Sequence, residues 1–87
     1  MDNTLFSDFT EAEFLDFVTK VYHADKAAYP SESLHTAAVL AFEKLSEHPA
    51  GSDLLYFPEP GKDGPEAIVS EVKAWRAANG KPGFKNA

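Results

Sequence analysis

The sequence of 87 residues predicts an all-α protein with three full helices, one short helix and a single domain spanning residues 1–87. Three observations support this fold class. Apolar residues recur at intervals of three and four in three segments. Stretches rich in proline and glycine separate these segments. No segment alternates between polar and apolar residues as a strand would. A chain of this length can form one core, although with little stability to spare.

The first helix is predicted over residues 11–24. Thr10 and Glu13 have the spacing of a capping box, in which each side chain accepts a hydrogen bond from a backbone amide of the other residue. Phe9 and Phe14 have the spacing of a hydrophobic staple, which packs the residue before the cap against the first turns. The apolar face consists of Phe14, Leu15, Val18, Val21 and Tyr22.

The second helix is expected to begin after Ser31, a residue type that favours the N-cap position. Its expected buried face consists of Leu34, Ala38, Ala41, Phe42 and Leu45. Thr36, Val39, Leu40 and Glu43 lie largely off that stripe. This places Val39 and Leu40 on the solvent side, although an aliphatic pair there usually indicates that contact with the core extends beyond the stripe. We expect His48, at the end of this helix, to satisfy its last backbone carbonyls.

The segment between Pro49 and Pro58 has room for only one or two helical turns. Gly51 or Ser52 is expected to cap this short helix. A last helix is predicted from Pro65, because proline favours the first helical position. Its apolar stripe consists of Ile68, Val69, Val72 and Trp75, and Gly80 and Pro82 end it.

The formal net charge of −6 is distributed unevenly. Residues 1–60 contain eleven acidic and three basic side chains, whereas residues 61–87 contain three acidic and five basic ones. An acidic surface repels nucleic acid and anionic membranes and attracts a basic partner. The alternative is that the acidic residues serve solubility alone.

The sequence lacks the usual patterns of a catalytic or metal site. His23, His35 and His48 do not have metal-ligand spacing. Ser52 and Asp53 resemble a nucleophile with an acid, but adjacent residues cannot form a catalytic triad. Cysteine is absent, which excludes disulfides and thiolate chemistry. No apolar run approaches the roughly 18 residues needed to span a bilayer, and no signal-peptide pattern is visible. We therefore predict a protein that is not an enzyme and needs no cofactor.

Tyr56 and Phe57 are two aromatic residues on the short element. Neighbouring residues on a helix point in different directions, so we expect one ring to face inward and the other outward. Tyr56 facing outward beside Asp53 would form an aromatic anchor next to a negative charge. Such an anchor suits a basic protein partner.

Three blocks of the sequence, "FTEAEFLDFV", "EHPAGSDLLYFP" and "VKAWRAANGKPGF", resemble the immunity proteins of bacteriocin nucleases, the colicin and S-type pyocin DNase group. The resemblance extends from Ser7 to Phe84, and the segment "DKAAYPSESLHTAAVL" looks more like the pyocin branch. It implies a distorted four-helix bundle with a short third helix. It also implies that the protein binds the basic DNase domain of a cognate bacteriocin beside its active site and holds it inactive.

The resemblance further implies a bacterial cytoplasmic protein that is a monomer before complex formation and can leave the cell together with the bacteriocin. Neither nucleic acid nor membrane would be a direct partner. The shared toxin-binding element would consist of Gly51, Ser52, Asp53, Tyr56, Phe57 and Pro58. The element that selects the nuclease would consist of Tyr22, His23, Lys26, Glu32, Thr36, Val39, Leu40 and Glu43. Many relatives have a second tyrosine where this chain has Phe57, so a hydrogen bond from that hydroxyl would be missing.

Two other functions remain open from the residues themselves. A small acidic bundle could bind a metal or a small ligand through its histidines. It could also act as a general mimic of nucleic acid, occupying basic DNA-binding proteins without selecting one.

Overall fold

The computed structural model describes residues 6–56, 61 and 64–85. The described residues form a short 3-10 helix η1 (Phe6–Asp8) and the helices α1 (Glu11–Tyr22), α2 (Glu32–Ser46), α3 (Asp53–Tyr56) and α4 (Pro65–Ala78). They contain no strand. The predicted all-α fold, a small distorted four-helix bundle with a short third helix, is therefore confirmed.

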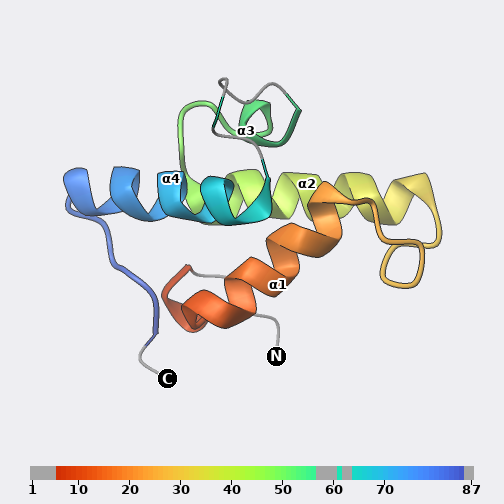
Figure 1. Ribbon diagram of the computed structural model, residues 1–87, viewed down its shortest axis with the longest axis horizontal. Coiled ribbons are helices and arrows are strands. Elements are labelled where there is room, and N and C mark those ends of the chain that lie inside the picture. The colour runs from red at the N-terminus through yellow and green to blue at the C-terminus, as the bar shows by residue number, and fades with distance from the viewer. Residues whose placement is uncertain (1–5, 57–60, 62–63, 86–87) are drawn as a thin grey trace.

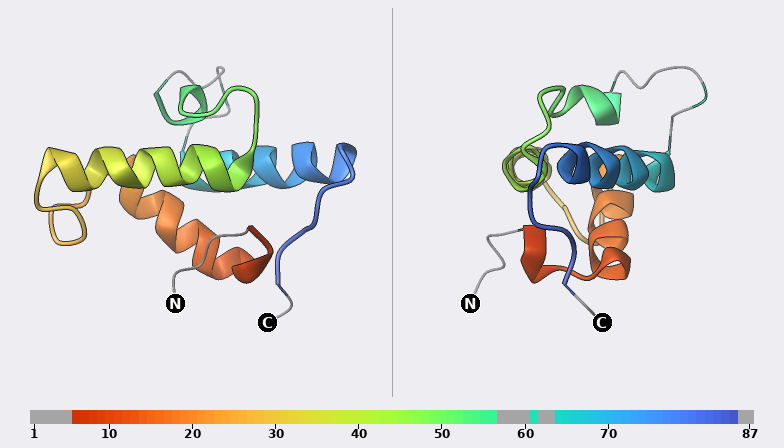
Figure 2. Two further views of the ribbon diagram at one scale, coloured as in Figure 1. Left: turned by 180° about the vertical axis from the view of Figure 1, so that it is seen from behind. Right: turned by 90° about the vertical axis from the view of Figure 1, so that its left-hand side faces the viewer.

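Helices α2 and α4 lie side by side, and the other two helices lie on opposite sides of this pair (Figures 1 and 2). Helix α1 crosses one side obliquely, whereas the single turn of α3 lies on the other side. The core forms where these helices meet, and its largest fully buried side chains include Phe14, Phe42, Ile68, Val18 and Val72. Helices α1, α2 and α4 thus form most of the core, and α3 packs against one side of it.

Helix α1 begins with the predicted capping box. The Thr10 amide donates to Glu13 Oε1 at 2.9 Å, and the Glu13 amide donates to Thr10 Oγ1 at 3.1 Å. The Phe9 and Phe14 rings lie with their centroids 5.9 Å apart, as the staple predicts. The helix ends two residues earlier than expected, because Ala24 has a φ of 50°, a left-handed conformation that a helix cannot include.

The buried face of α2 differs from the predicted one. Ser31 caps the helix as expected, with its hydroxyl accepting from the Leu34 amide at 3.3 Å. Val39, expected on the solvent side, is only 8% exposed, whereas Leu34, expected in the core, is 50% exposed. Ala41 is also exposed, and Leu40 is exposed as predicted. The neighbouring helices cover an arc centred on Phe42, and at 100° per residue this arc includes position 39 and leaves positions 34 and 41 on its flank.

Arg76, on α4, satisfies the last carbonyls of α2. Its side chain is almost fully buried, and Nη1 donates to the carbonyl oxygens of Leu45 and Ser46 at 3.2 and 3.3 Å. Its Nε and Nη2 both donate to the Pro82 carbonyl at 3.1 Å, and its guanidinium lies 4.2 Å from the centre of the Phe6 ring. One cation therefore joins α2, α4, η1 and the C-terminal segment.

The expectation that His48 would satisfy those carbonyls is wrong. Its Nδ1 accepts from the Ala50 amide at 3.0 Å, and its Nε2 lies 3.1 Å from Glu71 Oε2 on α4. Accepting at Nδ1 places the ring proton on Nε2, which then donates to the carboxylate. The imidazole thus connects the turn before α3 to α4, because Arg76 already occupies the carbonyls.

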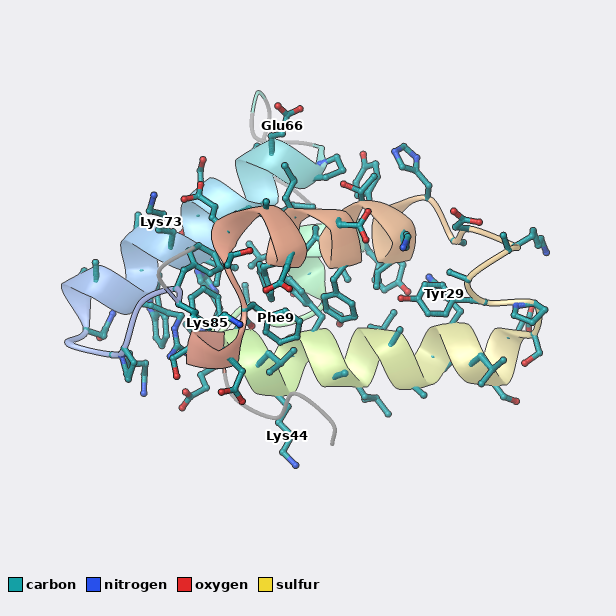
Figure 3. The ribbon with its side chains drawn as sticks, turned by 90° about the horizontal axis from the view of Figure 1, so that it is seen from below. Phe9, Tyr29, Lys44, Glu66, Lys73 and Lys85 are labelled. Atoms are coloured by element: carbon teal, nitrogen blue, oxygen red, sulfur yellow. The ribbon has the colours of Figure 1, made fainter. Side chains whose placement is uncertain are left out.

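The C-terminal segment folds back across the start of the chain. Gly80 ends α4 with a φ of 68°, and the Lys81 amide donates to the Arg76 carbonyl at 2.9 Å. The Phe84 ring stacks on Phe6 with centroids 4.3 Å apart. The next amide, that of Lys85, donates to the Phe9 carbonyl at 2.7 Å, and Figure 3 shows these two residues side by side.

Candidate functional site

Helix α3 presents a tyrosine and a carboxylate to solvent. Leu55 is 7% exposed and packs into the core, whereas Tyr56 is 54% exposed. Asp53 is exposed as well, and it lies one turn before Tyr56 on the same face of the helix. Tyr56 therefore faces outward, which is the direction that an aromatic anchor requires. Phe57 and Pro58 lie outside the described residues.

The turn that leads into α3 brings its start back against α2. Glu47 and Gly51 both adopt left-handed conformations, with φ of 58° and 52°. Ser52 follows, and its carbonyl accepts from the amides of Leu55 and Tyr56 at 2.9 and 3.1 Å. Its own amide donates to Glu43 Oε2 on α2 at 3.1 Å. These contacts orient the short helix relative to the core.

The residues predicted to select a partner fall into separate groups. Glu32, Thr36 and Leu40 are exposed on α2, as a contact role requires. Glu43 is half-buried beside the start of α3, and the side chain of Val39 is buried, so it offers little surface to a partner. The expectation that Val39 is exposed is therefore wrong.

The remaining three of these residues lie near the end of α1. Tyr22 is half-buried and packs against the core, whereas His23 and Lys26 are exposed. The segment that carries His23 and Lys26 connects α1 to α2, and it lies on the opposite side of the α2–α4 pair from α3 (Figures 1 and 2). The fold therefore does not bring this group next to the α3 surface.

Several basic side chains are neutralised by carboxylates away from α3. Lys73 on α4 lies 2.8 Å from Glu11 on α1, and Lys20 pairs with its own-helix neighbour Asp16 at 2.9 Å. Figure 3 shows Lys73 on α4, near α1. These ion pairs account for Lys20 and Lys73, both of which lie on helices other than α3.

The carboxylate of Glu47 accepts hydrogen bonds from two basic side chains. Its Oε2 accepts from Arg76 at 3.1 Å and its Oε1 accepts from Lys81 at 3.2 Å. The hydrogen bond from Arg76, and after it that from Lys81, lowers the pKa of the Glu47 carboxyl below its ordinary value. This carboxylate therefore stays charged and supports the turn that carries α3.

The described residues do not provide a metal site. No group of three or more His, Cys, Asp or Glu side chains among them could hold a metal ion. His35 Nε2 instead lies 2.9 Å from the Val21 carbonyl.

Two hollows of about 130 and 210 Å³ are lined by residues outside α3, the first around Arg76 and the second between α1 and α4. No helix in the described part of the chain has the length and apolar character needed to cross a bilayer. Tyr56 and Asp53, exposed together on α3, suit contact with another protein.

Comparison with known proteins identifies the family. The family of colicin immunity protein / pyocin immunity protein matches residues 6–78. Over 80 residues, the chain is 55% identical to the Pyocin-S1 immunity protein of Pseudomonas aeruginosa and to the Pyocin-S2 immunity protein of its strain PAO1. Each match covers 91% of this chain and 92% of the relative.

Two solved structures have the same fold. A chain in the crystal structure of the pyocin AP41 DNase–immunity complex has a TM-score of 0.84 and 39% identity, with coverage of 98% of this chain and 100% of that chain. A chain in the structure of the mutant nuclease domain of pyocin S8 with its cognate immunity protein has a TM-score of 0.84 and 34% identity, covering 97% and 100%. The chain therefore belongs to the colicin and pyocin immunity protein family, and it is similar to the pyocin branch of that family.

Proposed function

We propose that this protein binds the nuclease domain of a cognate bacteriocin and inhibits its DNase activity, which protects the producing cell. The observation that carries this proposal is the exposed Tyr56 next to Asp53, on a short helix anchored to a rigid core. Tyrosine buries a large area with few rotatable bonds and is enriched among the residues that dominate binding energy. The relatives in the DNase–immunity and nuclease–immunity complexes have the same fold and support this partner class.

The acidic character of the chain suits a basic nuclease surface. Residues 1–60 contain eleven acidic against three basic side chains, and α2 and α3 lie within them. A DNA-cleaving enzyme must attract phosphate, so an acidic protein bound beside its active site would repel DNA and block it sterically. In this proposal the inhibitor is not itself an enzyme and needs no cofactor.

The toxin-binding element of this proposal is the α3 segment, Gly51, Ser52, Asp53, Tyr56, Phe57 and Pro58. The partner-selecting element is the flank of α2 on which Glu32, Thr36 and Leu40 lie, which is also the flank of Glu43. Tyr22, His23 and Lys26 would add contacts only to a partner that reaches past the N-terminal end of α2. We propose that the free protein is a monomer in the bacterial cytoplasm and can leave the cell bound to the bacteriocin.

The test is inhibition of DNA cleavage by the nuclease encoded next to this gene. Equimolar protein should abolish cleavage, and undiminished cleavage would refute the proposal. Tyr56→Ala should weaken binding by at least about 2 kcal/mol, the scale of a dominant interface residue. Leu34→Ala is the matched control, because the exposed fraction of Leu34 is 50%, close to the 54% of Tyr56. Leu34 lies on the flank of α2 opposite to Glu43, the residue that contacts the start of α3. Equal effects of the two substitutions would show that α3 is not the anchor.

A salt series separates selective binding from general mimicry of nucleic acid. A shaped aromatic anchor should retain most of its affinity at high salt, because apolar burial is not screened. Equal inhibition of unrelated basic DNA-binding proteins, with complete loss at high salt, would favour the mimic.

A further inference from the structure

The carboxylate of Glu43 is connected to Tyr56 through one residue. Glu43 Oε2 accepts from the Ser52 amide at 3.1 Å, and the Ser52 carbonyl accepts from the Tyr56 amide at 3.1 Å. The side chain of Glu43 therefore holds the residue from which the only turn of α3 starts. Among the described residues, the Glu43 carboxylate is the side-chain group that accepts from the Ser52 amide.

Gly51 provides the room for this contact. A Cβ atom built on Gly51 would lie 2.8 Å from Glu43 Oε2 and 3.4 Å from Glu43 Cγ, closer than the carboxylate can tolerate without moving. The φ of 52° at Gly51 also favours glycine, because other residues adopt this left-handed conformation at a cost. The glycine and the glutamate thus form one local arrangement.

Helix α3 depends on such support because it is only four residues long. A single helical turn is not stable in water, since fixing its backbone costs more than its hydrogen bonds return. The first amides of any helix also lack partners within the helix. A carboxylate that accepts from one of them satisfies the donor and interacts favourably with the positive end of the helix dipole.

We propose that Glu43 is a positioning residue for Tyr56 and Asp53, and that it acts through the Ser52 amide, not as a charge that contacts the partner. The inference rests on the proposed function, because it assumes that α3 is the surface that binds the nuclease domain. It departs from the expectation that Glu43 is a specificity contact on α2. The two roles make different demands: positioning needs an oxygen that accepts a hydrogen bond, whereas a charge contact needs the negative charge.

Two substitutions of Glu43 separate these demands. Glu43→Gln retains an acceptor oxygen without the charge, and Glu43→Ala removes both. With the purified nuclease domain, Glu43→Ala should raise the Kd at least tenfold, and Glu43→Gln should stay within about threefold of the unsubstituted protein. Equal weakening by both substitutions would overturn the proposal, and so would an unchanged Kd for Glu43→Ala.

A double-mutant cycle tests the connection to the anchor. If Glu43 acts by holding α3 in place, Glu43→Ala should weaken binding much less when Tyr56 is already alanine. Fully additive effects would contradict the connection. Gly51→Ala should displace the carboxylate through its Cβ, and its effect is measured in the free protein as faster exchange of the Ser52 amide, because Gly51 itself belongs to the proposed binding element.

Hydrogen exchange in the free protein tests the positioning role without a partner. Glu43→Ala should accelerate exchange of the Ser52 amide at least tenfold and leave the amides of α1 and α4 unchanged, whereas Glu43→Gln should preserve protection. Unchanged exchange at Ser52 would overturn the inference. If the unsubstituted protein does not inhibit the nuclease, the proposed function fails, and the exchange result still decides whether Glu43 holds α3.

Discussion

Replacing Arg76 with methionine should destabilise the protein strongly, although the residue is a single cation near the end of α4. The guanidinium is 3% exposed and donates to the carbonyl oxygens of Leu45, Ser46 and Pro82 at 3.1 to 3.3 Å. Methionine retains most of the apolar stem and removes every donor. The substitution therefore isolates the hydrogen bonds from the packing.

The size of the effect follows from the carbonyls that lose their partner. The carbonyls of Leu45 and Ser46 are at the C-terminus of α2, where the helix itself provides no donor. Leaving a buried acceptor unsatisfied costs about 1–3 kcal/mol. The pair with Glu47 adds little, because that carboxylate is half exposed. Two helix carbonyls and the Pro82 carbonyl, which water can reach more easily, together give a loss of about 3 kcal/mol. That is a large part of the roughly 5–15 kcal/mol that stabilises a typical domain.

Urea unfolding, followed by far-UV circular dichroism and by the fluorescence of the single tryptophan, measures this loss. Lys73→Met is the matched control, because Lys73 lies on the same helix and also pairs with a glutamate, but both partners are more than half exposed. It should cost less than about 1 kcal/mol. Equal losses for Arg76→Met and Lys73→Met would refute the assignment of Arg76 as the connection between α2, α4 and the C-terminal segment.

Four further substitutions test other contacts. Thr10→Ala should cost about 1 kcal/mol, because it removes the hydroxyl that accepts from the Glu13 amide in the capping box. An unchanged urea midpoint would contradict this. Val39→Ala should cost about 2 kcal/mol and Leu34→Ala less than about 0.5 kcal/mol; the reverse order would contradict the observed buried face of α2. Glu47→Gln should make the free energy of unfolding depend less on pH in the acidic range. The pKa of Glu47 is lowered from 4.5, chiefly by Arg76, so its contribution is present above the unfolded-state pKa and is lost as the pH falls through the lower folded-state pKa. Thermal unfolding of both proteins across this range measures it, and identical pH dependence would contradict it.

The local parts of the fold were predictable because their causes are local. The capping box of Thr10 and Glu13, the N-cap Ser31 and the position of Pro65 at the start of α4 each depend on residues within one helical turn. One outward ring on the short helix could be expected in the same way, since neighbouring residues on a helix point in different directions, and the structure shows that Tyr56 faces outward. Here the inward residue is Leu55.

The errors arose where a side chain depends on a neighbouring element. Val39 was expected in solvent and Leu34 in the core, because periodicity defines an apolar stripe but not which arc of the helix its neighbours cover. His48 was expected to satisfy the last carbonyls of α2. Arg76 satisfies them instead, and it lies 30 residues after Ser46 in the chain. The one available signal was that a basic residue follows Trp75 within the apolar face of the last helix.

The amino-acid sequence alone was sufficient for the helices, their caps, the acidic character and the family, because each of these depends on composition or on residues close together in the chain. The tertiary structure was needed to show that Glu43 holds Ser52, that Arg76 is buried, and that Tyr22, His23 and Lys26 lie apart from α3. Those facts depend on how helices dock across a shared core. Docking is a sum of many long-range contacts, and no short segment of sequence contains them.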